Sequence, residues 1–500
     1  MNTTIHLHTR LQVDKVDPRV FGGFLEHLGR AVYDGLYNPK SVHSDANGWR
    51  KDVMAALDRL KFTAMRYPGG NFVSGYHWLD GVGPRQDRPL VRDIAWSSLE
   101  CNEIGTNEFI ELARKMKWTP MIAVNLGTGT PEEARNLVEY CNVECGGKYA
   151  DLRVDHGFAD AHRVKLWCLG NEMDGHWQIG HVPADHYAIK AQQAARMMKM
   201  CDPNIELVAC GSCAPDLPTY LEWDRIVLEH LRDEADYISV HRYVGNADDD
   251  TEEYLAVTNS VDAQIEEAFA MCRFVHRVRK TKRLARLSFD EWNVWYRARS
   301  GDHLDGRGKY APHLLEEHYN LEDAVVVAGF LNSFVRHADA VKIANLAQIV
   351  NVIAPILTEG DSMLLQTIFY PFEMFSSRRT GIALQIATEG PSYESKEHGR
   401  AEYIDASAIL NGDEVSVFAT NRHLTKPMTV KVRIADAPIE RVLSSEIVAG
   451  NGPKDANTFE DPNRVRSINF TDIKICHGSA IFEMPPLSIW AGTFALMPGE

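Results

Sequence analysis

Eight short apolar runs separated by helical segments are the feature that most limits how this chain can fold. Such runs indicate buried strands, and strands that alternate with helices form parallel sheets. Eight strand–helix units can close the sheet into a (β/α)8 barrel, which we predict as an α/β fold. The predicted strands are residues 20–26, 62–68, 120–126, 164–169, 205–210, 237–243, 284–289 and 341–346.

Helical segments connect these runs. The alternative arrangement is an open, doubly wound sheet, but no GxGxxG or GxxxxGK[ST] motif follows any of the runs. The closed barrel is therefore favoured. The predicted helices include residues 107–117, 131–142, 184–200, 251–279 and 320–337.

The chain changes character after about residue 380. Short alternating segments there are separated by Asn-Gly, Pro and Asp turns, which is typical of an all-β sandwich. The first residues also alternate, so their strand could complete that sandwich. For the 500 residues we predict a barrel at 19–380 and a C-terminal, jelly-roll-like β-sandwich at 381–500, completed by residues 1–18.

A formal net charge of −16 argues against nucleic-acid or anionic-membrane partners, because phosphate groups need a positive surface. The start of the chain lacks an apolar core long enough for a signal peptide, and no later run of about 20 apolar residues could span a bilayer. We therefore expect a cytoplasmic protein.

Nine scattered cysteines, an odd number, indicate reduced thiols more than a disulfide framework. Cys210 and Cys213 have the spacing of a zinc-ligand pair. However, Cys210 ends a strand-like run instead of flanking a short knuckle. We favour small residues near a strand end and predict no metal site.

Polar side chains follow most of the predicted barrel strands, and the carboxyl ends of barrel strands surround the active site. Amides, carboxylates and a guanidinium, with tryptophans in adjacent loops, suit a sugar, whose hydroxyls need polar partners while its C–H faces lie on aromatic rings. A phosphate would need lysines and a glycine-rich loop instead. The strand-end residues are Glu26, His27, Arg66, Asn71, Asn125, Asn171, Glu172, His241, Tyr243, Glu291, Trp292, Asn345 and Gln348, and the tryptophans are Trp78, Trp96, Trp177 and Trp295.

Glu172 and Glu291 follow the fourth and seventh strands, and a pair of acids is the minimum machinery for splitting a glycosidic bond. A separation of about 5 to 5.5 Å would give retention of configuration. One acid must then stay protonated, with a raised pKa, while the other stays ionised. We expect Arg66 to keep Glu291 charged, Tyr243 to orient it, and Asn171 to bind the sugar 2-hydroxyl.

Each residue also has a purely structural interpretation. A glutamate at a strand end is about as often a salt-bridged rim residue, and Arg66 alone is more often structural. Trp292 and Trp295 are more often packing residues than sugar platforms. His241 and His27 are most often hydrogen-bonded core residues, and their spacing is not that of metal ligands. Only the joint pattern favours a hydrolytic site.

Two motifs are highly specific, GNEMDG at 170–175 and DEWNVWY at 290–296. On these motifs the chain resembles the glycoside hydrolase family 51 α-L-arabinofuranosidases. The resemblance runs through the whole barrel, whereas the terminal β-domain matches in character more than in motif. The other matching stretches are 22–37, 65–78, 95–109, 121–130, 166–181, 239–250, 287–297 and 344–356.

Position by position, the resemblance implies Glu172 as acid/base and Glu291 as nucleophile. It also implies that no cofactor is needed and that the protein is a homo-hexamer. The chain differs from the family pattern at His176, where proline is usual, and at Leu364 and Leu365, where a Trp-Arg pair is usual. We expect both differences to affect which leaving groups are preferred. With His241 added, the predicted sugar contacts are Glu26, Arg66, Asn71, Trp96, Asn171, His241, Tyr243, Trp295 and Gln348.

The predicted function is that of a retaining, exo-acting α-L-arabinofuranosidase that trims arabino-oligosaccharides such as arabinan or arabinoxylan fragments. Three alternatives stay open. The first is another barrel hydrolase, an endoglucanase or xylosidase, which would share the acid pair but not the ring pocket. The others are a sugar-binding barrel without turnover and a zinc-dependent hydrolase.

Overall fold

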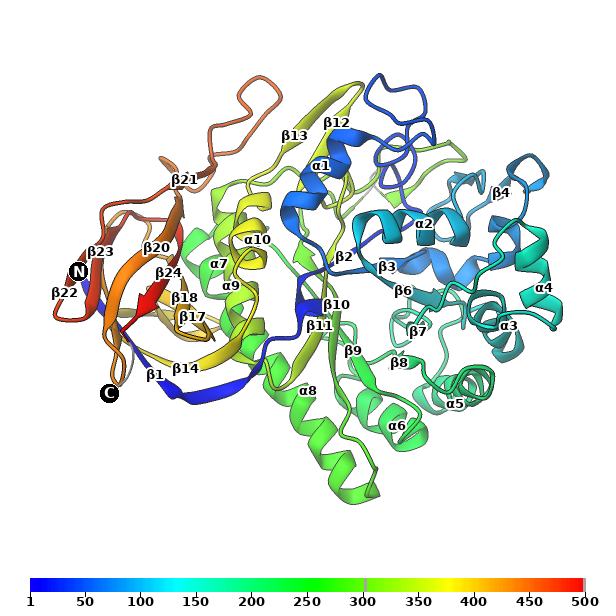
Figure 1. The fold of residues 1–500 in the computed structure, drawn as a ribbon, viewed down its shortest axis with the longest axis horizontal. Coiled ribbons are helices and arrows are strands. Elements are labelled where there is room, and N and C mark those ends of the chain that lie inside the picture. The colour runs from blue at the N-terminus through cyan, green and yellow to red at the C-terminus, as the bar shows by residue number, and fades with distance from the viewer. Residues whose placement is uncertain (301–303, 498–500) are drawn as a thin grey trace.

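The computed structural model describes residues 1–300 and 304–497 and contains a closed parallel barrel beside a domain built mostly of sheet (Figure 1). This confirms the predicted fold class. The barrel order is β10-β11-β2-β3-β6-β7-β8-β9. In chain order its strands are β2 (Gly22–Phe24), β3 (Ala64–Tyr67), β6 (Thr119–Val124), β7 (Leu166–Leu169), β8 (Glu206–Ala209), β9 (Tyr237–Val244), β10 (Arg286–Val294) and β11 (Val341–Ala347).

All eight predicted strands exist, but the seventh was placed too early. β10 continues through Glu291 to Val294, with Glu291 opposite His241 of β9. The predicted strand ended at residue 289 because the acidic pair at 290–291 interrupts the apolar run, yet this pair lies well inside the sheet. Glu291 is therefore held by backbone pairing on a strand, not by a loop.

Helices surround the barrel (Figure 1). The single helix predicted for residues 251–279 is wrong, because the chain forms two helices separated at Val257. The sequence interpretation also omitted α1, whose buried stripe includes Val53, Leu57 and Leu60. The helices are α1 (Lys51–Leu60), α2 (Thr106–Met116), α3 (Pro131–Asn142), α4 (Lys148–Asp155), α5 (Ala184–Cys201), α6 (Glu222–Leu231), α7 (Thr251–Ala256), α8 (Thr258–Arg279), α9 (Leu321–Arg336) and α10 (Phe369–Ser376).

A compact apolar cluster fills the barrel interior below the strand ends. It includes Met121, Leu166, Val208 and Ile343, contributed by β6, β7, β8 and β11. Side chains that point into a barrel of this size pack in layers and leave no pore. The polar residues at the carboxyl ends of the strands therefore rest on a solid apolar floor.

Ten strands form the second domain, in the order β21-β20-β24-β18-β17-β14-β1-β19-β23-β22. Strands β23 and β24 are far apart in this order, yet Phe482 and Trp490 pack at 4.2 Å between ring centroids, so the sheet folds over its own core. The strands are β1 (Asn2–Lys15), β14 (Ile382–Glu389), β17 (Ile404–Asn411), β18 (Glu414–Asn421), β19 (Met428–Ile434), β20 (Ile439–Val448), β21 (Ser467–Asn469), β22 (Lys474–Cys476), β23 (Ser479–Met484) and β24 (Ser488–Leu496).

The N-terminal strand completes this sheet, as predicted. β1 pairs antiparallel with β14 and parallel with β19. The domain limits at residues 18/19 and 380/381 remain a proposal, and residues 498–500 of the predicted sandwich lie outside the described residues. Three two-stranded hairpins lie outside both sheets, β4–β5 (Val91–Arg92, Leu99–Glu100), β12–β13 (Ile356–Glu359, Ser362–Leu365) and β15–β16 (Ser392–Ser395, Gly399–Glu402).

A half-buried arginine joins the two domains. Arg336 of α9 donates to Asp405 of β17 at 2.8 Å and to Asp262 of α8 at 2.7 Å. These partly shielded ion pairs hold α8, α9 and β17 in place, because loss of the cation would leave two carboxylates unpaired. Within the described residues, no helix is long and apolar enough to cross a membrane.

Candidate active site

Glu172 and Glu291 face each other at the mouth of the barrel. Glu172 follows β7 in a left-handed backbone conformation, with φ of 42°, directly after Gly170 and Asn171. A side-chain oxygen of Glu172 and one of Glu291 lie within 4.8 Å of each other. The two acids are thus close enough to act on opposite sides of one glycosidic carbon.

Two donors hold the Glu291 carboxylate. Arg66 donates to one of its oxygens at 2.6 Å, and the Tyr243 hydroxyl donates to the other at 2.8 Å. The Arg66 side chain is buried, lies 3.3 Å from Asp290, and also donates to Asn171 Oδ1 at 2.7 Å. One guanidinium therefore orients both Glu291 and the residue that precedes Glu172.

Different groups hold Glu172. Its Oε1 lies 2.9 Å from His241 Nδ1, and its Oε2 accepts a hydrogen bond of 2.8 Å from the Trp177 indole. On its other side, His241 Nε2 lies 3.0 Å from Ser239 Oγ, which donates to Asp290. A chain of polar groups thus runs from the buried Asp290 to Glu172.

His241 carries the proton of this cluster. Burial lowers the pKa of His241, but the charge of Glu291 and the contacts to Asp290 and Glu172 outweigh burial and raise this pKa to about 10. Burial raises the pKa of Glu172, yet the hydrogen bond and charge of His241 hold it below its ordinary value.

The pKa of Glu291 lies above its ordinary value because of burial and, next to the opposing charge of His241, the charge of Glu172. The raised pKa predicted for Glu172 is therefore wrong. The proton rests instead on His241, which the sequence could not place beside Glu172.

A cavity of about 560 Å³ opens above the two glutamates. Its lining includes most of the predicted site residues, namely Glu26, Asn71, Trp96, Glu172, Tyr243, Glu291, Trp295 and Gln348. The other three, Arg66, Asn171 and His241, are buried directly behind the two acids and contact them or their neighbours. The polar ring predicted from the strand ends is thus brought together around one cavity.

Glu26 closes the end of the cavity opposite β8. Its Oε1 accepts from Phe72 N at 2.9 Å and from the Trp96 indole at 3.1 Å. Gln348 accepts from Glu26 N at 2.9 Å, and its amide lies 3.3 Å from Glu26 Oε2. Burial and then the charge of Glu291 raise the pKa of Glu26 to about 8. At neutral pH this carboxyl is therefore protonated.

We expect the Glu26→Gln variant to be more stable than the natural protein at pH 8 but not at pH 4. In the unfolded chain Glu26 ionises near 4.5, whereas in the folded protein it stays neutral up to about 8. Its contribution to stability is complete below pH 4.5 and is lost as the pH rises to 8. We expect a difference of about 1 to 3 kcal/mol in urea unfolding. A difference that does not change with pH, or one that the exposed Glu389→Gln control also shows, would contradict this.

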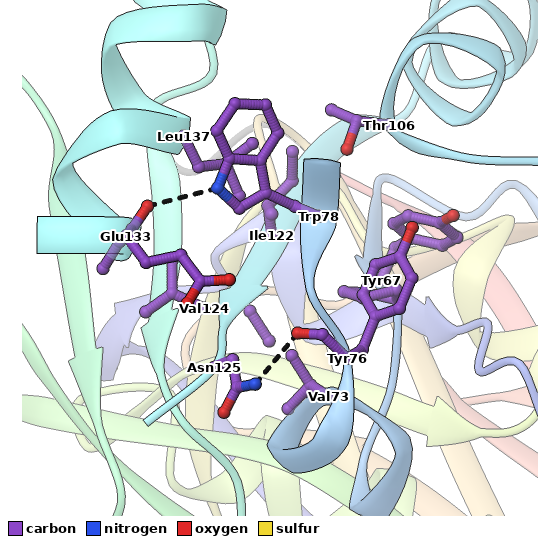
Figure 2. Close-up of a pocket in the computed structure, with 13 residues that line it drawn as sticks. Tyr67, Val73, Tyr76, Trp78, Thr106, Ile122, Val124, Asn125, Glu133 and Leu137 are labelled. Atoms are coloured by element: carbon purple, nitrogen blue, oxygen red, sulfur yellow. Dashed lines mark hydrogen bonds between the residues drawn. The ribbon is translucent and has the colours of Figure 1, made fainter. Parts of the chain in front are cut away.

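Some polar strand ends have structural partners instead. His27 lies 2.8 Å from both Glu100 and Tyr67, and Asn345 donates to Gly23 O at 2.9 Å. Asn125 donates to Tyr76 O at 2.9 Å beside a second cavity, where Trp78 donates to Glu133 O (Figure 2). That cavity, of about 20 Å³, has room for about one water molecule and cannot hold a sugar.

The sequence profile of the α-L-arabinofuranosidase C-terminal domain matches residues 290–488, and that of the α-L-arabinofuranosidase 1 domain matches residues 56–260. An intracellular exo-α-(1→5)-L-arabinofuranosidase from Halalkalibacterium halodurans is 46% identical over 434 residues, which cover 86% of this chain and 87% of that protein. The chain belongs to the family 51 α-L-arabinofuranosidases.

Solved structures agree with this membership. A family 51 α-L-arabinofuranosidase from Bifidobacterium longum superposes with a TM-score of 0.94 at 35% identity, covering 98% of this chain and 99% of that one. The arabinose complex of an α-L-arabinofuranosidase from Thermotoga maritima gives a TM-score of 0.88 at 32% identity, covering 99% and 100%. The resemblance found in the sequence is confirmed.

Sequence reasoning missed several residues of this arabinofuranosidase-family site. Asp290 holds both Arg66 and His241, and its position directly before Glu291 was the only signal for it. Trp177 was noted only as a nearby aromatic residue, yet it donates to Glu172. The loop at 213–216 and Arg242 line the cavity. The sequence interpretation noted Cys213 only as half of a possible zinc-ligand pair and Arg242 only within the matching stretch 239–250, and it gave neither a role in the site. The departures at His176, Leu364 and Leu365 lie outside the cavity lining.

Glu172, His241 and Glu291 also have the geometry of a metal-binding group, since one potential ligand atom of each lies within 4.8 Å of the others. Their chemistry does not fit a metal. Arg66 already neutralises Glu291 at 2.6 Å, and a His241 pKa of about 10 leaves no free lone pair on Nδ1 at neutral pH.

Proposed function

We propose that the protein is a retaining, exo-acting α-L-arabinofuranosidase, with Glu172 as acid/base and Glu291 as nucleophile. The observation that carries the proposal is the spacing of the two acids, with side-chain oxygens within 4.8 Å. An inverting enzyme needs about 6.5 to 9.5 Å between its carboxyl groups to admit a water molecule. Membership of the family supports the sugar and bond type.

In the first step a Glu291 oxygen attacks the anomeric carbon while the bond to the leaving oxygen breaks. Arg66 and Tyr243 aim the attacking carboxylate, because each donates to it. Glu172 gives its proton to the leaving oxygen. That proton can come from His241, whose Nδ1 lies 2.9 Å from Glu172 Oε1.

In the second step a water molecule attacks the anomeric carbon and Glu172 takes a proton from it, so that Glu291 is released and the sugar departs with its original configuration. As an ester Glu291 is uncharged, and its charge is the leading influence that raises the pKa of His241. The pKa of His241 is therefore lower while Glu291 is an ester than while Glu291 is a free carboxylate.

Glu26, Asn71, Trp96, Trp295 and Gln348 line the cavity around these acids, and we propose that they bind the arabinofuranosyl ring. Arg66, Asn171, His241 and Tyr243 contact the acids themselves, and we assign their substrate contacts by family resemblance. The neutral Glu26 carboxyl can donate a hydrogen bond to a ring hydroxyl, which an ionised carboxylate cannot do.

A panel of 4-nitrophenyl glycosides tests the proposed substrate. We expect the α-L-arabinofuranoside to be turned over and the β-D-glucoside and β-D-xyloside to be poor substrates, because the acid pair is common to barrel glycosidases and only the ring pocket selects the sugar. Preferred turnover of the glucoside or xyloside would favour the alternative hydrolases. Tight binding with negligible turnover would favour a sugar-binding barrel.

The relatives support a proposal for the linkage and the cellular setting. The Halalkalibacterium protein is named an intracellular exo-α-(1→5) enzyme, which supports the same linkage and a cytoplasmic location here. α-(1→5)-Arabinobiose, compared with its (1→3) isomer, tests the linkage. The resemblance further supports a homo-hexamer, for which light scattering should give six times the mass of the chain.

We expect retention to be visible as transfer. In the presence of methanol, a covalent arabinosyl-enzyme should pass the sugar to methanol and yield methyl α-L-arabinofuranoside, detectable by proton NMR before it is hydrolysed. Formation of the β-anomer as the first product would contradict a double displacement.

We expect activity to be insensitive to chelator. Prolonged dialysis against EDTA should leave kcat/KM within the error of the untreated enzyme. The reason is that Arg66 already pairs with Glu291 and His241 with Glu172, so neither acid needs a metal ion. Loss of activity that zinc restores would support the zinc-dependent alternative instead.

A further inference from the structure

The leaving group must lie on the side of the barrel that carries Glu172, because this acid has to reach the leaving oxygen. Strands β7, β8 and β9 are consecutive in the barrel, and Glu26 and Gln348 belong to the opposite arc. The leaving-group wall of the cavity is therefore made of Trp177, the loop at 213–216 and Arg242 of β9.

Arg242 is a half-buried arginine with few partners. Its Nη2 donates to Ser260 Oγ at 2.8 Å, and its Nε is buried with no partner. Among the described residues no carboxylate oxygen lies within 4.0 Å of it, whereas Arg66 and Arg336 each have two acidic partners. Burial lowers the pKa of Arg242, and the smaller opposing influences of Asp216 and Tyr220 do not offset it.

A desolvated cation without a counter-ion is costly in the free protein and gains most from a ligand that brings a negative charge. A second arginine adds positive charge on the neighbouring wall, because Arg299 lies over the Trp295 ring at 4.9 Å and also lines the cavity. The negative charge of Asp216 opposes the positive charge of the two arginines, but Asp216 is exposed and its charge is therefore well screened by solvent and salt.

We propose that Arg242 is a specificity-determining residue that selects leaving groups carrying a carboxylate, such as a uronic acid residue next to the scissile bond. The carboxylate would lie against the open edge of the guanidinium, on the wall that includes Pro215 and Asp216. The inference rests on the proposed arabinofuranosidase activity and adds to it the charge class of the second sugar.

Matched aryl arabinofuranosides test this. The probes are the 3- and 4-carboxyphenyl α-L-arabinofuranosides and the corresponding carbamoylphenyl compounds, which have the same shape without the charge. For the natural protein we expect the ratio of kcat/KM, carboxylate over amide, to exceed that of Arg242→Gln by about threefold to thirtyfold, mostly through KM. Dividing by the variant's ratio cancels the difference in leaving-group chemistry.

Three further measurements make the result decisive. Arg242→Lys should keep part of the preference, Asp216→Asn should increase it, and 0.5 M salt should reduce it. The matched control is Arg277→Gln, an exposed residue of α8 about 25 Å along the helix from Ser260, which should leave the ratio unchanged.

Equal ratios for the natural protein and Arg242→Gln, at unchanged melting temperature, would overturn the proposal. If Arg242→Gln fails to fold, the Arg242→Lys and Asp216→Asn arms decide it. Failure of the natural protein to hydrolyse even the carbamoylphenyl compounds would instead refute the arabinofuranosidase activity, so the two failures are distinguishable.

Discussion

Replacing Glu291 with alanine should lower kcat on 4-nitrophenyl α-L-arabinofuranoside by at least about 10⁴-fold, because no other group can form the covalent intermediate. Two neighbouring carboxylates are already held by other groups: Glu172 is hydrogen-bonded to His241 and Trp177, and Asp290 is buried against Arg66. Neither is placed to attack the same carbon.

The shortened side chain offers a second measurement. Azide should enter the space left by the Glu291 carboxylate and restore turnover, giving the β-L-arabinofuranosyl azide, which has inverted configuration. Glu389→Ala, an exposed change in the sheet domain, serves as the control and should retain full activity. Appreciable turnover by Glu291→Ala without azide would sink the assignment of the nucleophile.

The Glu172→Ala variant should divide substrates by leaving group. A 2,4-dinitrophenyl leaving group needs little protonation, so its kcat/KM should fall by less than about tenfold, whereas arabinobiose should lose about 10³-fold or more. Azide should attack the accumulated intermediate of this variant from the face opposite Glu291 and give the α-azide. The opposite azide anomers in the two variants identify the two roles independently of rate.

The pH profile should change in the same variant. The basic limb of kcat/KM that reports loss of the catalytic proton should disappear for the activated substrate, since that substrate does not use it. An equal loss on both substrates would mean that Glu172 acts through the structure of the cavity instead of through proton transfer.

The sequence was sufficient for the barrel and for the strand-end part of the cavity lining, because both follow from periodicity and from the rule that strand ends surround a barrel site. It named Arg66 and His241, but it did not name Asp290 and could not show how these three residues contact one another behind the lining. Asp290 and His241 come from the neighbouring strands β10 and β9, whereas Arg66 reaches them from β3 across the mouth of the closed barrel.

For the same reason, the location of the proton could not be predicted. It depends on distances between residues that are remote in the chain, such as the 2.9 Å between His241 and Glu172. The role proposed for Arg242 could not be predicted either, because it depends on which groups surround the guanidinium in the folded protein.

The pairing of β1 has a consequence for synthesis. Thr4 is registered with Glu389 and with Lys431, so the first strand must wait for partners translated far later. At about 5 to 20 residues per second this delay is about twenty seconds to more than a minute. The barrel can collapse during that time, while β1 remains an unpaired edge that a chaperone could protect and that a bulky N-terminal fusion could obstruct.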